Sequence, residues 1–203
     1  MMPPAEGCED RPAAVLFSRK VSGTGELALR PLNPEADARV VHGWVTSERA
    51  RFWGMQALSV GEVAQAYREI VSAPHSTAYI GMHDCCPAFL VEIYDPAGEP
   101  VGQCYEPQPT DRGMHLLIAE SQRPIHGFTW QVFTLVMDHI FRESRTDRVV
   151  VEPDVRNERI HAINRRAGFV YHRRIELPDK TAWLVTCTRA QYHAARRLGV
   201  IQQ

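Results

Sequence analysis

The stretch from Asp147 to Phe169 constrains the fold of this 203-residue chain more than any other part. Three consecutive valines at 149–151 form a β-branched run, which predicts a strand covered on both faces. Pro153 ends that strand, because proline cannot donate a hydrogen bond to a sheet ladder. Asn157 can then cap a helix, and Gly168 can end it. The unit places a loop at the carboxyl end of a buried strand, where α/β proteins commonly bind ligands.

The rest of the chain divides into apolar-patterned segments joined by turn residues. Alternating or unbroken apolar runs predict strands, and apolar residues at three- and four-residue spacing predict helices. We expect strands at 26–30, 88–94, 101–105, 114–118, 149–151, 169–175 and 182–187, and helices at 35–45, 60–72, 127–142, 158–166 and 189–198. Residues 95–98 would form a hairpin turn. A chain of this length suits one domain, so we expect an N-terminal tail or arm at 1–20 and a single domain at 21–203.

Composition argues against several classes of partner and chemistry. The formal net charge is −1, which favours neither nucleic acid nor an anionic membrane as a partner. The five cysteines include no CxxC pair, and the nine histidines include no HExxH motif, so we expect no disulfide framework and no metal. The N-terminus lacks the apolar core of a signal peptide, and no apolar run approaches the roughly 20 residues that span a bilayer. We therefore expect a cytoplasmic protein with a small-molecule partner.

His115 is the strongest candidate for chemistry, because it lies inside the apolar strand predicted at 114–118. A buried histidine is costly unless it is paired, and a backbone carbonyl in the core would be the simplest partner. Alternatively, His115 belongs to a site. Its strand precedes the helix at 127–142, and Glu152 and Asp154 follow the next strand, so the strand ends should converge. A histidine beside a carboxylate at this place would form a general-base pair.

Several motifs resemble the GCN5-related N-acetyltransferase (GNAT) superfamily. In that superfamily an Asn follows the fifth strand, and an Ala-rich helix then ends in Gly-Phe; the matching residues here are Asn157, Ala162, Gly168 and Phe169. An ordinary strand–helix–strand unit is the alternative explanation of these residues. The segments GMHLLIAES, EPDVRN and FWGM resemble, more narrowly, the siderophore-biosynthesis branch of the superfamily. That branch acylates the amine or N-hydroxyamine of lysine- and diamine-derived compounds.

This resemblance implies an α/β fold with a mixed, mostly antiparallel sheet of about seven strands, splayed at the fourth and fifth strands and covered by helices on both faces. It implies an acyl-CoA donor, acetyl-CoA or succinyl-CoA, and an acceptor such as N-hydroxylysine or N-hydroxycadaverine, converted to a hydroxamate for a siderophore. His115 and Asp154 would be catalytic. The donor would contact Leu116, Leu117, Ile118, Arg123, His126, Gly127, Phe128, Thr129 and Asn157, and the acceptor would contact Phe52, Trp53, Met55 and Tyr105.

The sequence departs from the superfamily pattern in two places. In the phosphate-binding turn, residues 124–129 retain only the central Gly127, and a simple glycine-started helix is the alternative for this loop. In many members of the superfamily a tyrosine at the position of Asn164 protonates the departing thiolate of CoA. Asn164 cannot do so, but a thiol with a pKa of about 8.5 leaves readily without an acid. Two other functions stay open: an N-acetyltransferase of a polyamine or antibiotic, and a catalytically silent acyl-CoA-binding module. Both a monomer and a homodimer fit the sequence.

Overall fold

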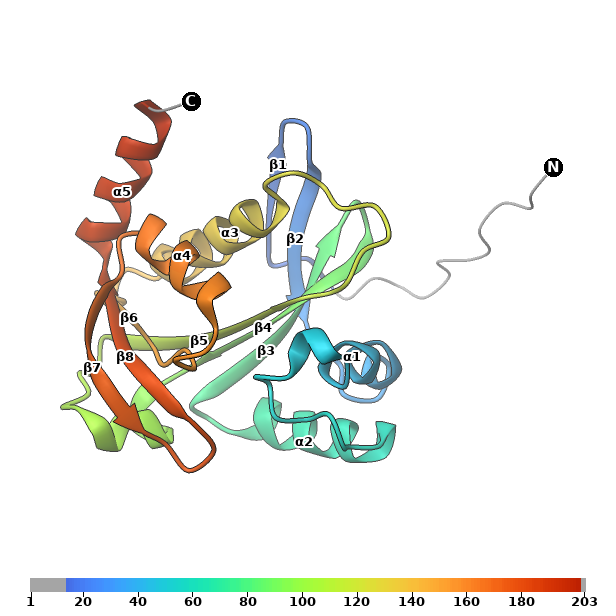
Figure 1. Cartoon of the computed structure of the whole chain (residues 1–203). Helices are drawn as coiled ribbons and strands as arrows, with labels where there is room; N and C mark the ends of the chain where they lie inside the picture. Colours follow the sequence, from blue (N-terminus) through green and yellow to red (C-terminus); the bar gives the residue numbers. More distant parts are fainter. Residues whose placement is uncertain (1–13, 202–203) are drawn as a thin grey trace.

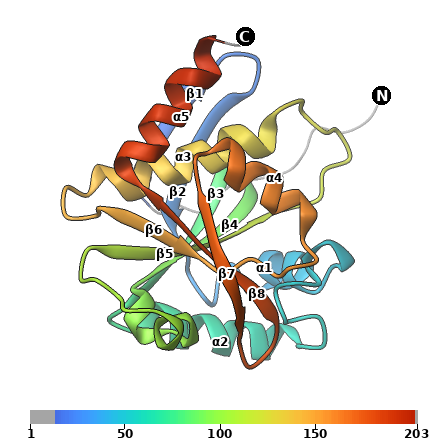
Figure 2. The same ribbon diagram turned by 60° about the vertical axis from the view of Figure 1, so that its left-hand side comes forward.

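The computed structural model describes residues 14–201, which form one eight-stranded sheet with helices on both faces (Figures 1 and 2). The strands are β1 (Phe17–Val21), β2 (Gly25–Pro31), β3 (Ser76–His83), β4 (Cys86–Tyr94), β5 (Asp111–Ile118), β6 (Arg148–Val151), β7 (Val170–Glu176) and β8 (Thr181–Thr188). The α-helices are α1 (Ala38–Val45), α2 (Val60–Ser72), α3 (Phe128–Arg142), α4 (Glu158–Arg166) and α5 (Arg189–Ile201). Three short 3₁₀ helices, η1 (Glu48–Ala50), η2 (Pro96–Gly98) and η3 (Pro100–Cys104), lie in the connections.

The sheet has one parallel pair of strands, and this pair is short. The strand order is β1-β2-β3-β4-β5-β6-β8-β7, and every neighbouring pair except β5 and β6 is antiparallel. β5 and β6 pair only between residues 111–113 and 148–150. Beyond Gly113, β5 continues to Ile118 with β4 as its partner. The predicted mixed sheet with splayed central strands is therefore confirmed.

Side-chain alternation along the central strands divides the core between the two faces. Phe89 and Val149 pack against α3 on one face, whereas Leu90 packs against Val63 and Tyr67 of α2 on the other. This is the period of two expected for strands buried on both faces. Figure 1 shows α3 and α4 above the sheet and α1 and α2 below it.

The helices predicted at 60–72 and 158–166 begin or end at local signals that the structure confirms, whereas the helix predicted from residue 35 begins at Ala38. Ser59 and Glu62 form the reciprocal capping box of α2. The Asn157 side chain accepts a hydrogen bond from the backbone of Ile160 and caps α4. Gly168 follows α4 with a φ of +89°, the left-handed conformation that glycine adopts without strain. These signals act within a few residues, so the sequence alone reveals them.

Three expectations about the sheet were wrong. Residues 17–20, assigned to a tail or arm, belong to the edge strand β1; residues 1–13 lie outside the described residues. β3 was not predicted, because Gly81 interrupts its apolar pattern. That glycine makes room for the Phe89 ring, which would lie 2.0 Å from a Cβ at position 81. Residues 101–105 do not return as a strand, because β3 and β5 already occupy both edges of β4.

Candidate active site

The candidate site is a cleft that opens where β5 and β6 diverge. A cavity of about 230 Å³ lies there, and its walls include Trp53, His115, Glu152, Asn157 and Lys180. These residues come from the α1–α2 connection, β5, the end of β6, the cap of α4 and the β7–β8 turn. The cleft therefore gathers residues from four segments that are far apart in the sequence.

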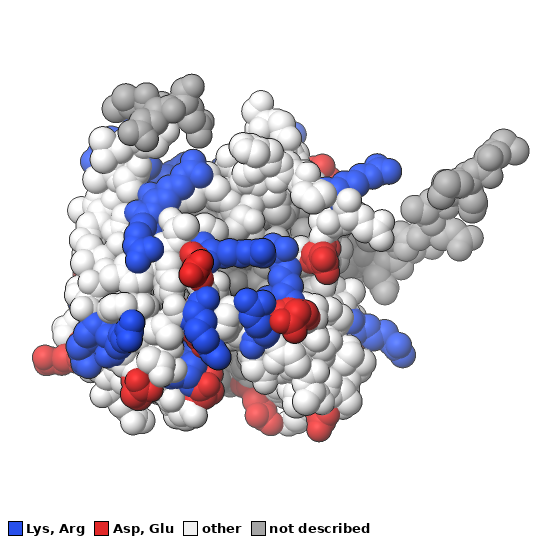
Figure 3. All heavy atoms as spheres, in the orientation of Figure 1, with Lys and Arg blue, Asp and Glu red and all other residues white. Residues whose placement is uncertain are grey.

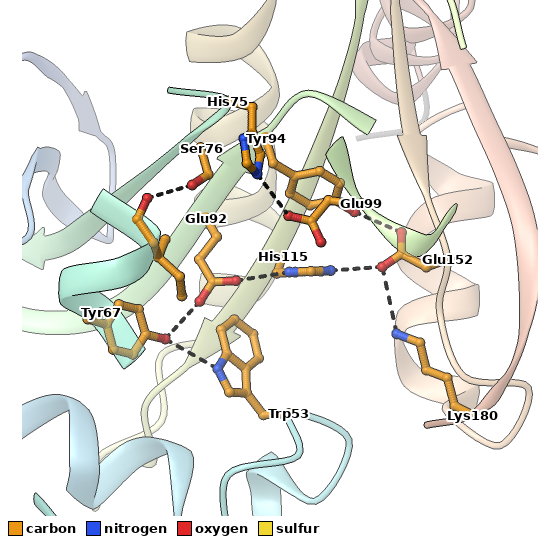
Figure 4. Close-up of polar contacts among 11 residues, drawn as sticks. Trp53, Tyr67, His75, Ser76, Glu92, Tyr94, Glu99, His115, Glu152 and Lys180 are labelled. Carbon is orange, nitrogen blue, oxygen red and sulfur yellow. Dashed lines mark hydrogen bonds and ion pairs between the residues drawn. The ribbon is translucent and has the colours of Figure 1, made fainter. Parts of the chain in front are cut away.

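His115 lies between two buried carboxylates. It stands directly opposite Glu92 in the β4–β5 register, and its Nδ1 lies 2.9 Å from Glu92 Oε2. Its Nε2 lies 2.8 Å from Glu152 Oε1, just past the end of β6 (Figure 4). Burial alone would lower the pKa of His115, but Glu152 and Glu92 outweigh burial and raise it to about 10. At neutral pH His115 is therefore an imidazolium that donates both N–H groups to carboxylates.

Each carboxylate is further satisfied by a tyrosine. The Tyr94 hydroxyl donates to Glu152 Oε2 at 2.8 Å, and the Tyr67 hydroxyl donates to Glu92 Oε1 at 2.8 Å. Burial raises the pKa of both tyrosines, so both remain neutral donors. Burial would also raise the pKa of Glu152, but His115 overcomes this effect and the pKa falls to about 2. The result is a paired, hydrogen-bonded charge cluster, the form in which buried charges are tolerated.

Asp154 does not make the expected pair with His115. Its carboxylate instead accepts hydrogen bonds from the backbone N–H and the guanidinium of Arg156, at 2.6–2.9 Å. The hydrogen bond from Arg156 lowers the pKa of Asp154. Asp154 and His115 line the same cavity, but Glu152 is the carboxylate that reaches the imidazole. A charged His115 also differs from the free base that we expected at this position.

The predicted acceptor loop reaches the cleft only in part. Phe52 and Trp53 line the cavity, and the Trp53 indole N–H donates to the Tyr67 hydroxyl at 3.3 Å. Met55 instead packs against the hydrophobic core beside α2. Tyr105 lies elsewhere, at the start of β5, where its hydroxyl donates to Asp111 at 2.9 Å.

Most of the predicted donor residues follow β5 towards the start of α3. The cavity walls include Leu116, Leu117, Ile118, Thr129 and Asn157. A neighbouring cavity shares Ile118 and Thr129 and adds Arg123 and Phe128. Gly127 caps α3 with a φ of +73°, and both it and His126 are exposed. A continuous path thus leads from His115 to the N-terminus of α3, a position that favours anions.

Four residues of the site were missed in the sequence, namely Glu92, Lys180 and the two tyrosines, Tyr67 and Tyr94, that bond the carboxylates. Glu92 lies within an apolar run, so the cost of burying a charge, which identified His115, also applies to it. Lys180 follows a turn in a polar segment, where its sequence resembles that of any surface lysine. In residues 14–201, no cluster of three or more His, Cys, Asp or Glu side chains is placed to hold a metal ion. No helix in the same range has the length and apolarity to cross a membrane.

The sequence matches the acetyltransferase (GNAT) domain model over residues 33–177, which is most of the chain. The chain belongs to the GNAT family. The predicted superfamily is thus confirmed.

Several curated relatives of this GNAT chain are named for acyl transfer to hydroxylated amines. N(6)-hydroxylysine O-acetyltransferase of Escherichia coli is 31% identical over 168 residues, which cover 82% of this chain and 53% of the relative. Hydroxyornithine transacylase SID3 of Ajellomyces capsulatus is 26% identical and covers 81% of this chain and 38% of the relative. N-hydroxyputrescine acetyltransferase of Acinetobacter baumannii is 26% identical, and the match covers 65% of this chain and 63% of the relative. The GNAT chain therefore spans about half of the first relative and less of the second.

Solved structures share the fold of this GNAT chain. An uncharacterized protein from Bacillus halodurans superimposes with a TM-score of 0.82 and 22% identity, covering 88% of this chain and 93% of the other. An aminoglycoside acetyltransferase in complex with coenzyme A and kanamycin superimposes with a TM-score of 0.73 and 20% identity, covering 84% of this chain and 99% of the other. At these identities the likeness establishes the fold alone.

Proposed function

We propose that this GNAT chain transfers an acyl group from acyl-CoA to the nitrogen of an N-hydroxylated amine, forming a hydroxamate for a siderophore. The names of relatives that act on hydroxylysine, hydroxyornithine and hydroxyputrescine support this acceptor class. The single observation that carries the proposal is the position of His115 between Glu92 and Glu152 in the cleft.

The charge state of this cluster favours an acceptor that arrives unprotonated. His115, with a pKa of about 10, and Glu152, with a pKa of about 2, are both poor proton acceptors at neutral pH. An alkylamine with a pKa of about 10.4 holds roughly one part in a thousand as free base at pH 7.4. An N-hydroxyamine is far less basic and has a free lone pair at that pH. It therefore needs no base before it attacks.

In the proposed reaction, the nitrogen lone pair attacks the carbonyl carbon of the thioester. The C–N bond forms and the C–S bond breaks, and one proton passes from nitrogen to the CoA sulfur. We place the donor along Leu116–Ile118 and the acceptor between Trp53 and Glu152, whose carboxylate accepts a hydrogen bond from the N-hydroxyl group. His115 fixes that carboxylate, so positioning supplies much of the rate.

The cytoplasm is the compartment that we propose for this reaction. Cys85, Cys86, Cys104 and Cys187 are free thiols. Unpaired cysteines are typical of reducing compartments.

The proposal is tested by measuring turnover of matched acceptors. N-hydroxylysine, N-hydroxycadaverine and their parent amines are each offered with acetyl-CoA and succinyl-CoA, and the products are quantified by mass spectrometry. At pH 7.4 the N-hydroxyamines should react roughly 10³-fold faster than the parent amines, because this is the difference in free base. The ratio should shrink about tenfold for each unit of pH rise up to the pKa of the parent amine. Equal rates at pH 7.4, or a ratio independent of pH, would refute the proposed acceptor class.

A further inference from the structure

Lys180 is a cation whose side chain turns into the cleft. It ends a tight turn between β7 and β8, which is closed by backbone hydrogen bonds in both directions between Leu177 and Lys180. Only 16% of its side chain is exposed, and it lines the same cavity as His115. Figure 4 shows Lys180 and Trp53 on one side of the row formed by Glu92, His115 and Glu152. The turn therefore directs an ammonium group towards the acceptor end of the cleft.

The ammonium group of Lys180 has unused hydrogen-bonding capacity. Within residues 14–201, its nearest carboxylate oxygen is Glu152 Oε1 at 3.7 Å, which is longer than a hydrogen bond. Glu152 is already hydrogen-bonded to His115 and Tyr94 at 2.8 Å each. The Nζ atom keeps contact with solvent in the cleft, and a lysine ammonium can donate three hydrogen bonds to a ligand. The arrangement is therefore suited to an anionic ligand that supplies the acceptors.

The wall of the cavity is cationic as a whole. Its charged residues are Arg49, His115, Arg159 and Lys180 against Glu152 and Asp154, and with Glu92, which pairs with His115 from behind the wall, the balance is about one positive charge. Figure 3 shows Lys and Arg side chains gathered on this face of the molecule, around α4 and the α1–α2 connection. The formal charge of the chain is only −1, so this excess is local. Such a wall attracts a carboxylate and repels the free ammonium group of a diamine or polyamine.

We propose that Lys180 binds a carboxylate of the substrate, and that the acceptor is an N-hydroxylated amino acid rather than an N-hydroxylated diamine. This inference rests on the proposed function. The phosphates of acyl-CoA are a poorer partner for Lys180, because Arg123 and the start of α3 line the neighbouring cavity and Lys180 does not. A dicarboxylic acyl group such as succinyl is the second source of a carboxylate, and the experiment separates the two sources.

The experiment compares Lys180→Met, which removes the charge, with Lys180→Arg, which retains it. Lys20→Met is the matched control, because Lys20 is the only other lysine in the chain and is exposed on β1, at the far edge of the sheet. The measured quantity is the ratio of kcat/KM for N-hydroxylysine to kcat/KM for N-hydroxycadaverine, with acetyl-CoA as donor. We expect Lys180→Met to lower this ratio roughly 10- to 100-fold, the usual effect of losing a charge-assisted hydrogen bond. Lys180→Arg and Lys20→Met should keep most of the wild-type ratio.

The same variants are assayed with acetyl-CoA and succinyl-CoA, using N-hydroxycadaverine as acceptor. A loss confined to succinyl-CoA would assign the carboxylate to the acyl group. Equal losses with every pair of substrates would mean that Lys180 only supports Glu152, and would overturn the proposal, as would unchanged ratios.

A wild-type protein without turnover would defeat the proposed function rather than this site. In that case, calorimetry on the CoA-loaded protein measures the affinity for each acceptor and tests the site without turnover. Tighter binding of N-hydroxylysine than of N-hydroxycadaverine, lost in Lys180→Met, supports the site; equal binding overturns it.

Discussion

Replacing Glu152 by Gln tests whether two carboxylates hold His115 in its charged form. The substitution keeps the size of the side chain and removes its charge, while Glu92 remains bonded to Nδ1. An opposite charge at such a distance shifts a histidine pKa by roughly 1 to 3. We therefore expect Glu152→Gln to lower the pKa of His115 by this amount from its value of about 10. Glu92→Gln should lower it less, because Glu152 contributes more to the raised pKa.

The pKa of His115 can be measured by following its ring NMR signals as the pH is varied. His115→Gln identifies these signals among those of the nine histidines. Glu106→Gln is the matched control, since Glu106 is exposed and lies outside the residues that line the cleft. Wild-type signals that titrate near pH 6.5 would refute the reasoning and restore His115 as a general base. An unchanged midpoint in Glu152→Gln would refute it as well.

The same pKa links the stability of the fold to pH. The folded chain holds the proton on His115 more tightly than the unfolded chain, whose histidine pKa is 6.5. Protonated His115 therefore stabilises the fold. This stabilisation is complete below pH 6.5 and is lost as the pH rises through about 10. Because 37% of the side chain is exposed, we expect a loss of only about 1–2 kcal/mol in the free energy of unfolding. Urea denaturation across this range should show it in the wild type and not in His115→Gln.

Three further substitutions probe Trp53 and Asp154 in the cleft and Gly113 beside it. Trp53→Ala should raise the KM for the acceptor much more than the KM for acyl-CoA, because the indole lies edge-on to His115 on the acceptor side; equal effects would reduce Trp53 to a packing role. Gly113→Ala should lower the free energy of unfolding by roughly 1–3 kcal/mol, because a Cβ there would lie 2.0 Å from the Tyr94 ring, and an unchanged urea midpoint would contradict this. Asp154→Asn and His115→Gln should have additive effects on log kcat, because no hydrogen bond or ion pair joins the two side chains among the described residues; a double-mutant cycle with strong coupling would reinstate the pair.

The elements predicted correctly are those defined by neighbours in the sequence. The capping box of α2 and the glycine after α4 each act within one turn of helix. β3 was missed because the role of Gly81 depends on Phe89, which stands opposite it on the next strand. Residues 101–105 have a strand-like composition, but a strand also needs a free edge, and the sequence does not reveal which edges are taken.

The site was predictable to the extent that burying a charge has a cost. That rule identified His115, and the same rule applied to Glu92 would have supplied its partner across the strands. Alternation could not separate Glu152 from Asp154, because residues two apart lie on the same face of a strand. Asp154 was chosen for its motif, whereas the structure turns it to Arg156. Lys180 is recognisable only once the β7–β8 turn is folded over the cleft.

The early parting of β5 and β6 gives the sheet interior edges in addition to the outer edges at β1 and β7. Along residues 114–118, alternate backbone groups of β5 face the gap instead of a neighbouring strand. An open edge normally invites another chain to add to the sheet. Here α3 lies on one face of this edge and the loop carrying Trp53 lines the cleft on the other. Amide exchange at 116–118 would therefore report occupancy of the gap, since a ligand that bonds along this edge completes the ladder without any movement of the fold.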